Sequence, residues 1–323
     1  MTPSPRVVAV VVAFNRRDLV TETLESLFAQ SRPVDAVIVV DNGSTDGTSE
    51  LVAERFPRAR LLTLDRNTGG AGGFAVGMER ALAVEDADWV WVMDDDTVPT
   101  ETALEALLRT ARVAPEGSDL FASRVVWTDG REHPMNMPRR KPFASRRSIA
   151  AAARHNAYPV RSVSFVSMMV SAAAIRRVGL PVAAYFLWND DFEFTARVLR
   201  RSRGYLAADS LVVHKTKVFG STDADPGERF WLEVRNKLWL FRFSDAFSLP
   251  EKALYLVATL RRWARTFLAS SDRGVLRRGL ATGLRDGLRT APEPNDVVLD
   301  GLPEAIVRGQ HELQAGADSG RSR

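Results

Sequence analysis

The sequence predicts an α/β fold with a mostly parallel central sheet and a C-terminal helical extension. Over residues 1–115, short apolar runs rich in β-branched residues alternate with amphipathic helical patterns. This alternation is typical of a parallel sheet with right-handed crossovers. From Glu228 onward the pattern is helical and rich in arginine.

Four strands are expected in the first half of the chain. Continuous apolar runs such as Val7–Phe14 predict strands that are covered on both faces. Asp18 can cap the first helix, and the polar segment Asp41–Gly47 has the composition of a turn. The expected strands are Val7–Phe14, Val34–Val40, Arg60–Leu64 and Trp89–Met93. The expected helices run from Asp18 to about Gln30, from Thr45 or Asp46, from the glycines after Asn67 to about Val84, and from about Thr100.

The second half is less regular. We expect strands at Leu120–Trp127, Ser164–Val170, Tyr185–Trp188 and Tyr205–His214, and a helix at Asp190–Arg203 that Gly204 ends. Pro250 and Gly274 are the expected breaks in the helical C-terminal region.

Composition excludes several kinds of site. The chain has no cysteine, which rules out disulfides, thiolate metal sites and cysteine nucleophiles. No stretch approaches the roughly 18 uninterrupted apolar residues of a membrane span. The net charge is only +4, yet the segment His133–Asn189 contains no acid and many arginines. Such a basic segment suits phosphate-bearing or anionic partners. We expect no nucleic-acid partner. The sequence is compatible with a homo-oligomer.

Three consecutive carboxylates follow the strand Trp89–Met93. Asp94, Asp95 and Asp96 would repel one another at neutral pH, and a site that tolerates this usually holds a cation. Alternate residues of an extended chain point the same way, so Asp94 and Asp96 can share one face. Oxygen ligands suit Mn²⁺ or Mg²⁺. The alternative is a solvated acidic turn that caps the next helix.

A second acidic cluster, Trp188-Asn189-Asp190-Asp191-Phe192-Glu193, opens a helix. The helix dipole favours acids there, so simple capping is one interpretation. Three acids beside a tryptophan exceed what a cap needs, and we predict a catalytic role for one of them. His214 ends the strand after this helix, and a neutral imidazole there can complete an Asp/Asp/His metal site.

The stretch Asn67–Phe74 reads NTGGAGGF and satisfies a dinucleotide-binding pattern. That pattern should follow the first strand directly, but the first strand is followed by Asn15-Arg16-Arg17. We therefore interpret the glycines as a place where the backbone passes close to a ligand, with Arg66 and Asn67 approaching it. A flexible turn before a helix is the alternative.

The segments VVAVVVAFNR, VIVVDNGSTDGT, NTGGAGGF, WVWVMDDD and WNDDFEFTARVLRRSRGY occur in this order. Together they resemble the inverting family-2 glycosyltransferases of the GT-A fold, over roughly Arg6 to Arg242. The glycine stretch, WVWVMDDD and WNDD look most like the actinobacterial galactofuranosyltransferases that act on a lipid-linked galactan primer. Rhamnosyltransferases share much of the pattern.

The resemblance implies a division of the chain. A GT-A domain would span 1–227, with a nucleotide-sugar half at 1–115 and an acceptor half at 116–227. A basic amphipathic helical region would span 228–308, and a disordered tail 309–323.

The resemblance also implies roles for single residues. Asp191 would be the general base, and Asp190 would hold acceptor hydroxyls together with Trp188 and Glu193. The metal ligands would be Asp94, Asp96 and His214. The donor-binding residues would be Phe14, Asn15, Asp41, Arg66, Asn67, Gly70, Asp94 and Asp95. Asn189 stands where close relatives often have an acid.

These roles imply a cytoplasmic enzyme that moves a sugar from a nucleotide diphosphate to a polyprenyl-linked or other glycan. The expected donor is UDP-galactofuranose. Transfer of rhamnose from dTDP-rhamnose is the alternative. A nucleotidyltransferase, a non-catalytic sugar-nucleotide binding module and a dehydrogenase are weaker alternatives. Arg229–Phe243 is expected to be mostly core, whereas Leu254–Leu288 has the amphipathic, arginine-rich pattern of a helix in a membrane interface or against a partner. We therefore expect peripheral attachment to an anionic inner leaflet.

Overall fold

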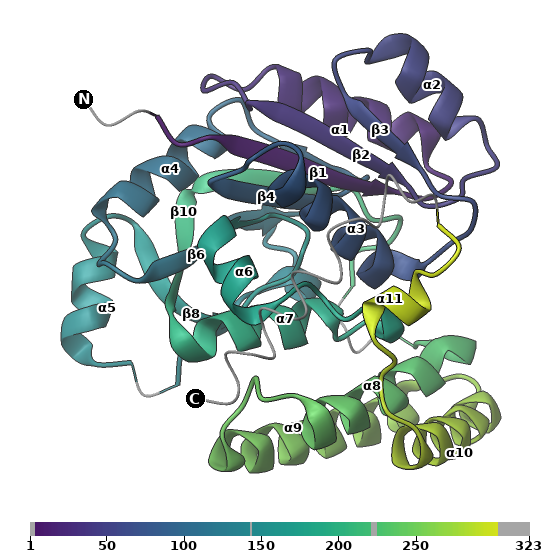
Figure 1. Ribbon diagram of the computed structural model, residues 1–323. Helices are drawn as coiled ribbons and strands as arrows, with labels where there is room; N and C mark the ends of the chain where they lie inside the picture. The colour runs from purple at the N-terminus through teal and green to yellow at the C-terminus, as the bar shows by residue number, and fades with distance from the viewer. Residues whose placement is uncertain (1–3, 143, 221–224, 303–323) are drawn as a thin grey trace.

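A mixed sheet forms the centre of the computed structural model, which describes residues 4–142, 144–220 and 225–302 (Figure 1). The strand order within these residues is β3-β2-β1-β4-β9-β6-β10-β8-β7, and β5 pairs with β10. The strands are β1 (Val7–Ala13), β2 (Ala36–Asp41), β3 (Arg60–Thr63), β4 (Trp89–Asp94), β5 (Thr97–Pro99), β6 (Ser118–Val126), β7 (Arg139–Arg140), β8 (Ala157–Ser162), β9 (Met168–Ser171) and β10 (Arg203–His214).

Helices cover both faces of this sheet and continue into a C-terminal group. The α-helices are α1 (Arg17–Phe28), α2 (Thr48–Arg55), α3 (Gly69–Ala83), α4 (Ala103–Val113), α5 (Arg146–Ala153), α6 (Ala172–Val178), α7 (Asp190–Arg201), α8 (Phe230–Phe243), α9 (Leu249–Ala269), α10 (Arg273–Arg289) and α11 (Asn295–Val298). Short 3-10 turns lie at Pro134–Asn136, Ala183–Tyr185 and Gly227–Arg229. In Figure 1, α8, α9 and α10 lie together at the bottom, below α7.

The predicted α/β fold is confirmed, and β1 shows why its sequence is apolar throughout. Alternate side chains of a strand point to opposite faces. Val8 and Val10 belong to the core cluster that contains Phe74 of α3, whereas Val7 and Ala9 pack with α1 and α4. β1 pairs in parallel with β2 and β4, so these three strands end at one edge. The second half of the chain adds mainly antiparallel pairs, together with the parallel pair β6–β10.

Several expected elements are corrected. Tyr185–Trp188 is not a strand, because Phe186 and Trp188 adopt φ values of 63° and 67° that no strand contains. Gly204 does not end α7 but lies inside β10, packed against Leu199. The expected breaks near Pro250 and Gly274 are present, because α8 ends at Phe243 before α9 begins, and α9 ends at Ala269 before α10 begins. Pro250 itself occupies the first turn of α9, where its missing N–H costs nothing.

Other boundaries also shift. The strand expected at Ser164–Val170 is shorter and later, at Met168–Ser171, and Gly274 lies in the first turn of α10. The strands β5, β7 and β8 and the helices α5 and α6 were not expected. The predicted tail at 309–323 lies outside the described residues.

The glycines of NTGGAGGF belong to α3, and their surroundings differ. A Cβ on Gly73 would lie 2.6 Å from Val12 Cγ1, and one on Gly77, one turn after this stretch, would clash with Val10 Cγ1. Gly70, at the start of the helix, has no atom within 4 Å of such a Cβ. A Cβ on Gly69 would meet the backbone of Phe186, and one on Gly72 would meet the side chain of Thr68. Within this stretch only Gly73 therefore reflects close packing between the helix and β1.

Gly77→Ala is expected to lower the free energy of unfolding by about 1–3 kcal/mol, because the added methyl group overpacks the contact with β1. Gly70→Ala is the matched control. It meets open space, and alanine favours the helix, so stability should be unchanged or slightly higher. Chemical denaturation of both variants checks this. Equal midpoints would contradict the packing role of Gly77.

Candidate active site

Polar side chains gather at the edge where β1, β2 and β4 end. Ala13 of β1 pairs with Asp41, and Val12 pairs with Asp94, so the ends of three parallel strands meet. The carboxyl ends of parallel strands are where α/β proteins bind ligands. β5 pairs antiparallel with β10 and sets His214 opposite Thr97, which brings His214 beside Asp96.

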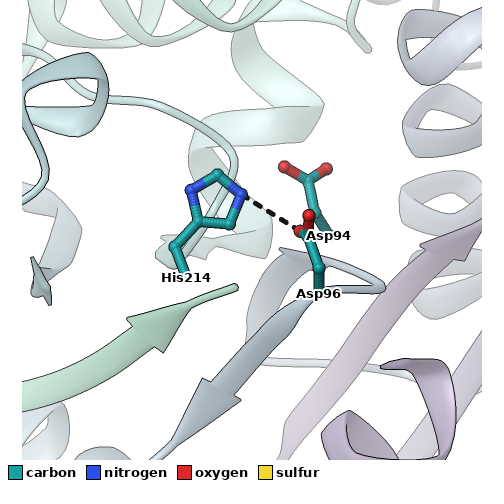
Figure 2. A group of neighbouring side chains, drawn as sticks. All are labelled: Asp94, Asp96 and His214. Carbon is teal, nitrogen blue, oxygen red and sulfur yellow. Dashed lines mark ion pairs between the residues drawn. The ribbon is translucent and has the colours of Figure 1, made fainter. Parts of the chain in front are cut away.

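Asp94, Asp96 and His214 form a group that fits a metal ion. Their ligand atoms all lie within 4.8 Å of one another. Figure 2 shows the three side chains converging, with His214 Nε2 3.0 Å from Asp96 Oδ1. Two carboxylates and one imidazole are suitable ligands for Mn²⁺ or Mg²⁺. The sequence-based selection of these three residues therefore agrees with the geometry.

The electrostatics of the acids also fit a cation. Burial, followed by the charge of Asp96, raises the pKa of Asp94 to about 6. Burial raises the pKa of Asp95 to about 7. Burial would also raise the pKa of Asp96, but His214 and Arg16 hold it below its usual value. A divalent cation would stabilise the ionised forms of all three acids.

Arg16, which follows β1, is a site residue that the sequence did not reveal. Its guanidinium forms a salt bridge with Asp96 and lies 3.7 Å from Asp95 Oδ1. The side chain is about 40% exposed, so it can move when a cation or an anionic group enters the site.

Asn136 orients His214 from outside the metal-ligand group. His214 Nδ1 lies 2.8 Å from Asn136 Oδ1, and Asn136 Nδ2 donates to Ser164 Oγ. With Nδ1–H donated to Asn136, Nε2 presents its lone pair toward Asp96. Two acceptor atoms face each other there, which requires a proton or a cation between them. Outer partners of this kind commonly fix the tautomer of a metal-binding histidine.

Asn136→Ala is expected to weaken Mn²⁺ binding by about 10–100-fold, the range typical for loss of an outer partner. Titration of Mn²⁺ followed by electron paramagnetic resonance at constant pH measures this. Met135→Ala, at an exposed neighbouring position, should bind Mn²⁺ like the wild type. Unchanged affinity in Asn136→Ala would show that another group orients His214.

The predicted nucleotide-binding residues Phe14, Asn15 and Asp41 lie together. Phe14 N donates to Asp95 Oδ2, and Asn15 Oδ1 accepts from Thr45 N at 2.8 Å. Asp41 is fully buried and accepts from Ser44 N in the turn after β2. These bonds connect the loops that follow β1, β2 and β4. The proposed contacts with the donor base stay predictions.

Arg66 and Asn67 have partners within the protein. Arg66 donates to the carbonyl oxygen of Asp300 at 2.6 Å, and so ties the segment after β3 to the C-terminal region. Asn67 Oδ1 accepts from Gly69 N at 2.7 Å. The approach of Arg66 and Asn67 to a donor stays a prediction.

Asp190 and Asp191 begin α7. Asp191 Oδ1 accepts from Phe192 N at 2.6 Å. Burial and mutual repulsion raise the pKa of Asp190 well above its usual value, and burial raises the pKa of Asp191. A carboxylate with a raised pKa is a stronger base once it is ionised. This pair can therefore accept a proton from a bound hydroxyl.

The neighbours of these acids have structural partners. Glu193 forms a buried ion pair with Arg197, at 2.9 Å, and accepts from Ser244 Oγ at 2.7 Å. Asn189 stands at the N-cap position of α7, but its side chain makes no capping bond and donates to Glu233 Oε2 instead. The predicted acceptor contacts of Trp188 and Glu193 are not tested by this geometry.

A strained loop holds the acids in place. Phe186, Trp188 and Asn189 all have φ between 63° and 67°, a conformation that is costly for residues other than glycine. The buried side-chain amide of Asn236, on α8, lies 2.9 Å from the carbonyl oxygens of Tyr185, Leu187 and Trp188. The C-terminal helices thus fix the backbone that leads into Asp190.

Comparisons with known proteins agree with this arrangement. The family model Glycosyl transferase family 2 matches residues 8–177. The galactofuranosyltransferase GlfT1 of Mycobacterium tuberculosis (strain ATCC 25618 / H37Rv) is 32% identical over 242 residues, which cover 70% of this chain and 79% of that protein. The N-acetylglucosaminyl-diphospho-decaprenol L-rhamnosyltransferase of the same strain is 28% identical over 227 residues, which cover 61% and 71%.

Among solved structures, S. aureus TarS 1–349 in complex with UDP-GlcNAc matches with a TM-score of 0.61 and 17% identity, over 98% of this chain and 89% of that one. At this identity the match shows the fold, and the expected GT-A type is confirmed. The family model covers more than half of the sequence. The chain therefore belongs to glycosyl transferase family 2 and is a glycosyltransferase.

Proposed function

We propose that this protein is a metal-dependent inverting glycosyltransferase that moves galactofuranose from UDP-galactofuranose to a lipid-linked glycan of the cell envelope. The observation that carries the proposal is the Asp94/Asp96/His214 group beside the acid pair Asp190-Asp191. A transferase needs both parts: a site for the leaving diphosphate and a base for the attacking hydroxyl.

Each part has a defined task. Asp94, Asp96 and His214 would hold Mn²⁺ or Mg²⁺, which neutralises the charge of a leaving diphosphate. Asp191 accepts the proton of the acceptor hydroxyl as that oxygen bonds to the anomeric carbon and the bond to the diphosphate breaks. Asp190 holds the hydroxyls of the acceptor. No general acid is needed, because the leaving diphosphate is already a weak base.

The sugar follows from similarity alone. The 32% identity to a galactofuranosyltransferase favours UDP-galactofuranose. The 28% identity to a rhamnosyltransferase makes dTDP-rhamnose the second candidate.

A thermal-shift panel of UDP, dTDP and NAD, each with Mn²⁺, Mg²⁺ or EDTA, tests the proposal, because a ligand of the folded state raises the melting temperature. We expect a metal-dependent shift with UDP. A shift confined to dTDP would favour rhamnose. An increase in melting temperature with NAD that is unchanged by EDTA would contradict a transferase site.

We also propose that the protein works in the cytoplasm, attached peripherally to the inner face of the membrane. No helix within the described ranges is both long and apolar enough to span a bilayer. α9 instead exposes apolar side chains beside the exposed Arg261 and Arg265, while Thr259 and Thr266 on its other side are buried. An apolar face with a basic edge suits an anionic interface. The exposed apolar residues are Leu249, Leu254, Leu256, Val257, Leu260 and Leu268.

Sedimentation with phosphatidylglycerol vesicles at low salt tests this attachment. We expect binding that weakens with salt, and Leu256→Ser/Leu260→Ser should reduce it. Wild-type protein that stays in the supernatant would contradict the proposal.

A further inference from the structure

Two cations approach one aromatic ring beside the proposed base. Arg139, on β7, places its guanidinium carbon 4.8 Å from the centre of the Phe192 ring. Lys237, on α8, places Nζ 4.2 Å from the same centre. Phe192 directly follows Asp191 in α7. Arg139 and Lys237 are 98 positions apart in the sequence, and the fold brings both to the Phe192 ring.

Lys237 is a residue that is only 4% exposed. Its ammonium group forms neither a salt bridge nor a hydrogen bond with the described residues, and its contact is the Phe192 ring. Burial and the nearby Arg139 lower its pKa to about 7. A buried charge normally has an anionic or hydrogen-bonding partner, because leaving it unpaired is costly. The cation–π contact with Phe192 offsets only part of this cost.

Asp191 does not supply the missing partner. Its charge interacts with both cations, but its carboxylate bonds instead to the backbone N–H of Phe192. Arg139 likewise forms no salt bridge in the described chain and is exposed. Two positive charges thus face one aromatic ring with no bonded anion between them.

We propose that Arg139 and Lys237 bind a phosphate group carried by the acceptor, while Asp191 receives the proton of its reacting hydroxyl. This inference rests on the proposed function and adds a second phosphate site, separate from the donor diphosphate site at Asp94 and Asp96. Guanidinium and ammonium groups are the usual ligands of phosphate oxygens.

The position of the pair relative to α9 suggests how such an acceptor lies. Tyr255 of α9 packs edge-on against Phe192 at 5.3 Å, and Arg139 lies 5.7 Å from the Tyr255 ring. The opposite side of α9 is the exposed apolar face. A molecule with a lipid at that face and a sugar at Asp191 would place its phosphate between them, at Arg139 and Lys237. One relative acts, by its name, on a diphospho-decaprenol.

Binding of farnesyl diphosphate to the full-length protein in EDTA tests the proposal, because EDTA suppresses metal-dependent binding at the donor site. We expect Arg139→Gln and Lys237→Gln each to weaken this binding by about 10-fold or more, as loss of a charged hydrogen bond implies. Arg140→Gln is the matched control, because Arg140 is the exposed neighbour that lies over Tyr158 instead. It should bind like the wild type.

Other outcomes are equally informative. Wild-type affinity in Arg139→Gln would overturn the proposal, as would an equal loss in all three variants, which indicates nonspecific attraction. Because Arg139 is exposed, its variant stays informative even if Lys237→Gln does not fold. If the cations only tuned Asp191, the variants would shift the pH profile of turnover and leave farnesyl diphosphate binding intact.

The source of the phosphate and the proposed function are tested separately. Inorganic diphosphate that binds as tightly as farnesyl diphosphate would support a site for the phosphate group itself. Tighter binding of farnesyl diphosphate would support a lipid-linked acceptor. The Mn²⁺-dependent shift with UDP should be unchanged in Arg139→Gln. Loss of that shift in the wild type would refute the transferase, whereas its presence without farnesyl diphosphate binding would refute only the acceptor site.

Discussion

Asp191→Asn is expected to reduce turnover by at least about 100-fold, because a general base typically contributes 10²–10⁴-fold. The amide is nearly isosteric but cannot take a proton from the acceptor hydroxyl. Thermal shifts with UDP and Mn²⁺ should remain, since Asp191 lies outside the Asp94/Asp96/His214 group. Turnover with a glycan acceptor, measured beside donor binding, checks both statements.

The pH profile provides an independent test of this assignment. Burial raises the pKa of Asp191, and only the ionised carboxylate can accept a proton. At saturating Mn²⁺, wild-type turnover should therefore increase with pH across this titration, and the residual turnover of Asp191→Asn should lack that increase. Asp190→Asn is the comparison variant, expected mainly to raise the KM for the acceptor. A larger loss of kcat in Asp190→Asn than in Asp191→Asn would indicate that Asp190 is the general base and that Asp191 binds the acceptor.

Asp96→Asn is expected to abolish the metal-dependent part of the thermal shift with UDP. Direct loss of a charged ligand should weaken Mn²⁺ binding by more than the roughly 10–100-fold expected for an outer partner such as Asn136. Asp209→Asn is the control, since Asp209 is an exposed residue that pairs with Arg109 and Asn156 and is not part of the metal-ligand group. A full shift in Asp96→Asn would rule out Asp96 as a ligand.

Metal binding should also depend on pH. The ligand form of Asp94 is the carboxylate, and its pKa is raised to about 6. Protons therefore compete with the metal below this pH. The apparent Mn²⁺ affinity should decrease as the pH falls through about 6 and level off above it.

The first half of the fold was predictable because its signals are local. β1 is buried on both faces and therefore continuously apolar, and β4 passes directly into three acids. The ends of neighbouring parallel strands must meet, so Asp41 and Asp94 could be placed at one edge from the sequence. His214 could be selected for the same reason, because it ends a strand.

The features of the fold and the site that the sequence did not predict depend on contacts between distant parts of the chain. Asn136 contacts His214 across 78 positions, and Asn236 contacts Tyr185 across 51. No local pattern marks either asparagine. The role of the glycines after Asn67 stays a prediction for a related reason, since the sequence does not distinguish a glycine that leaves room for a ligand from one that leaves room for a valine side chain. Tyr185–Trp188 resembles a strand in composition, yet α8 imposes a different backbone on it.

The bonds from α8 to the loop before Asp190 have a consequence for how the protein can be divided. The boundary expected at residue 227 separates the acid pair from the asparagine that holds its loop. A fragment ending there would retain every proposed catalytic side chain but would lose the amide that fixes three carbonyls of the preceding turn. The C-terminal helices are thus not a detachable module. Chimaeras that exchange this region between relatives would have to carry the loop and α8 as one unit.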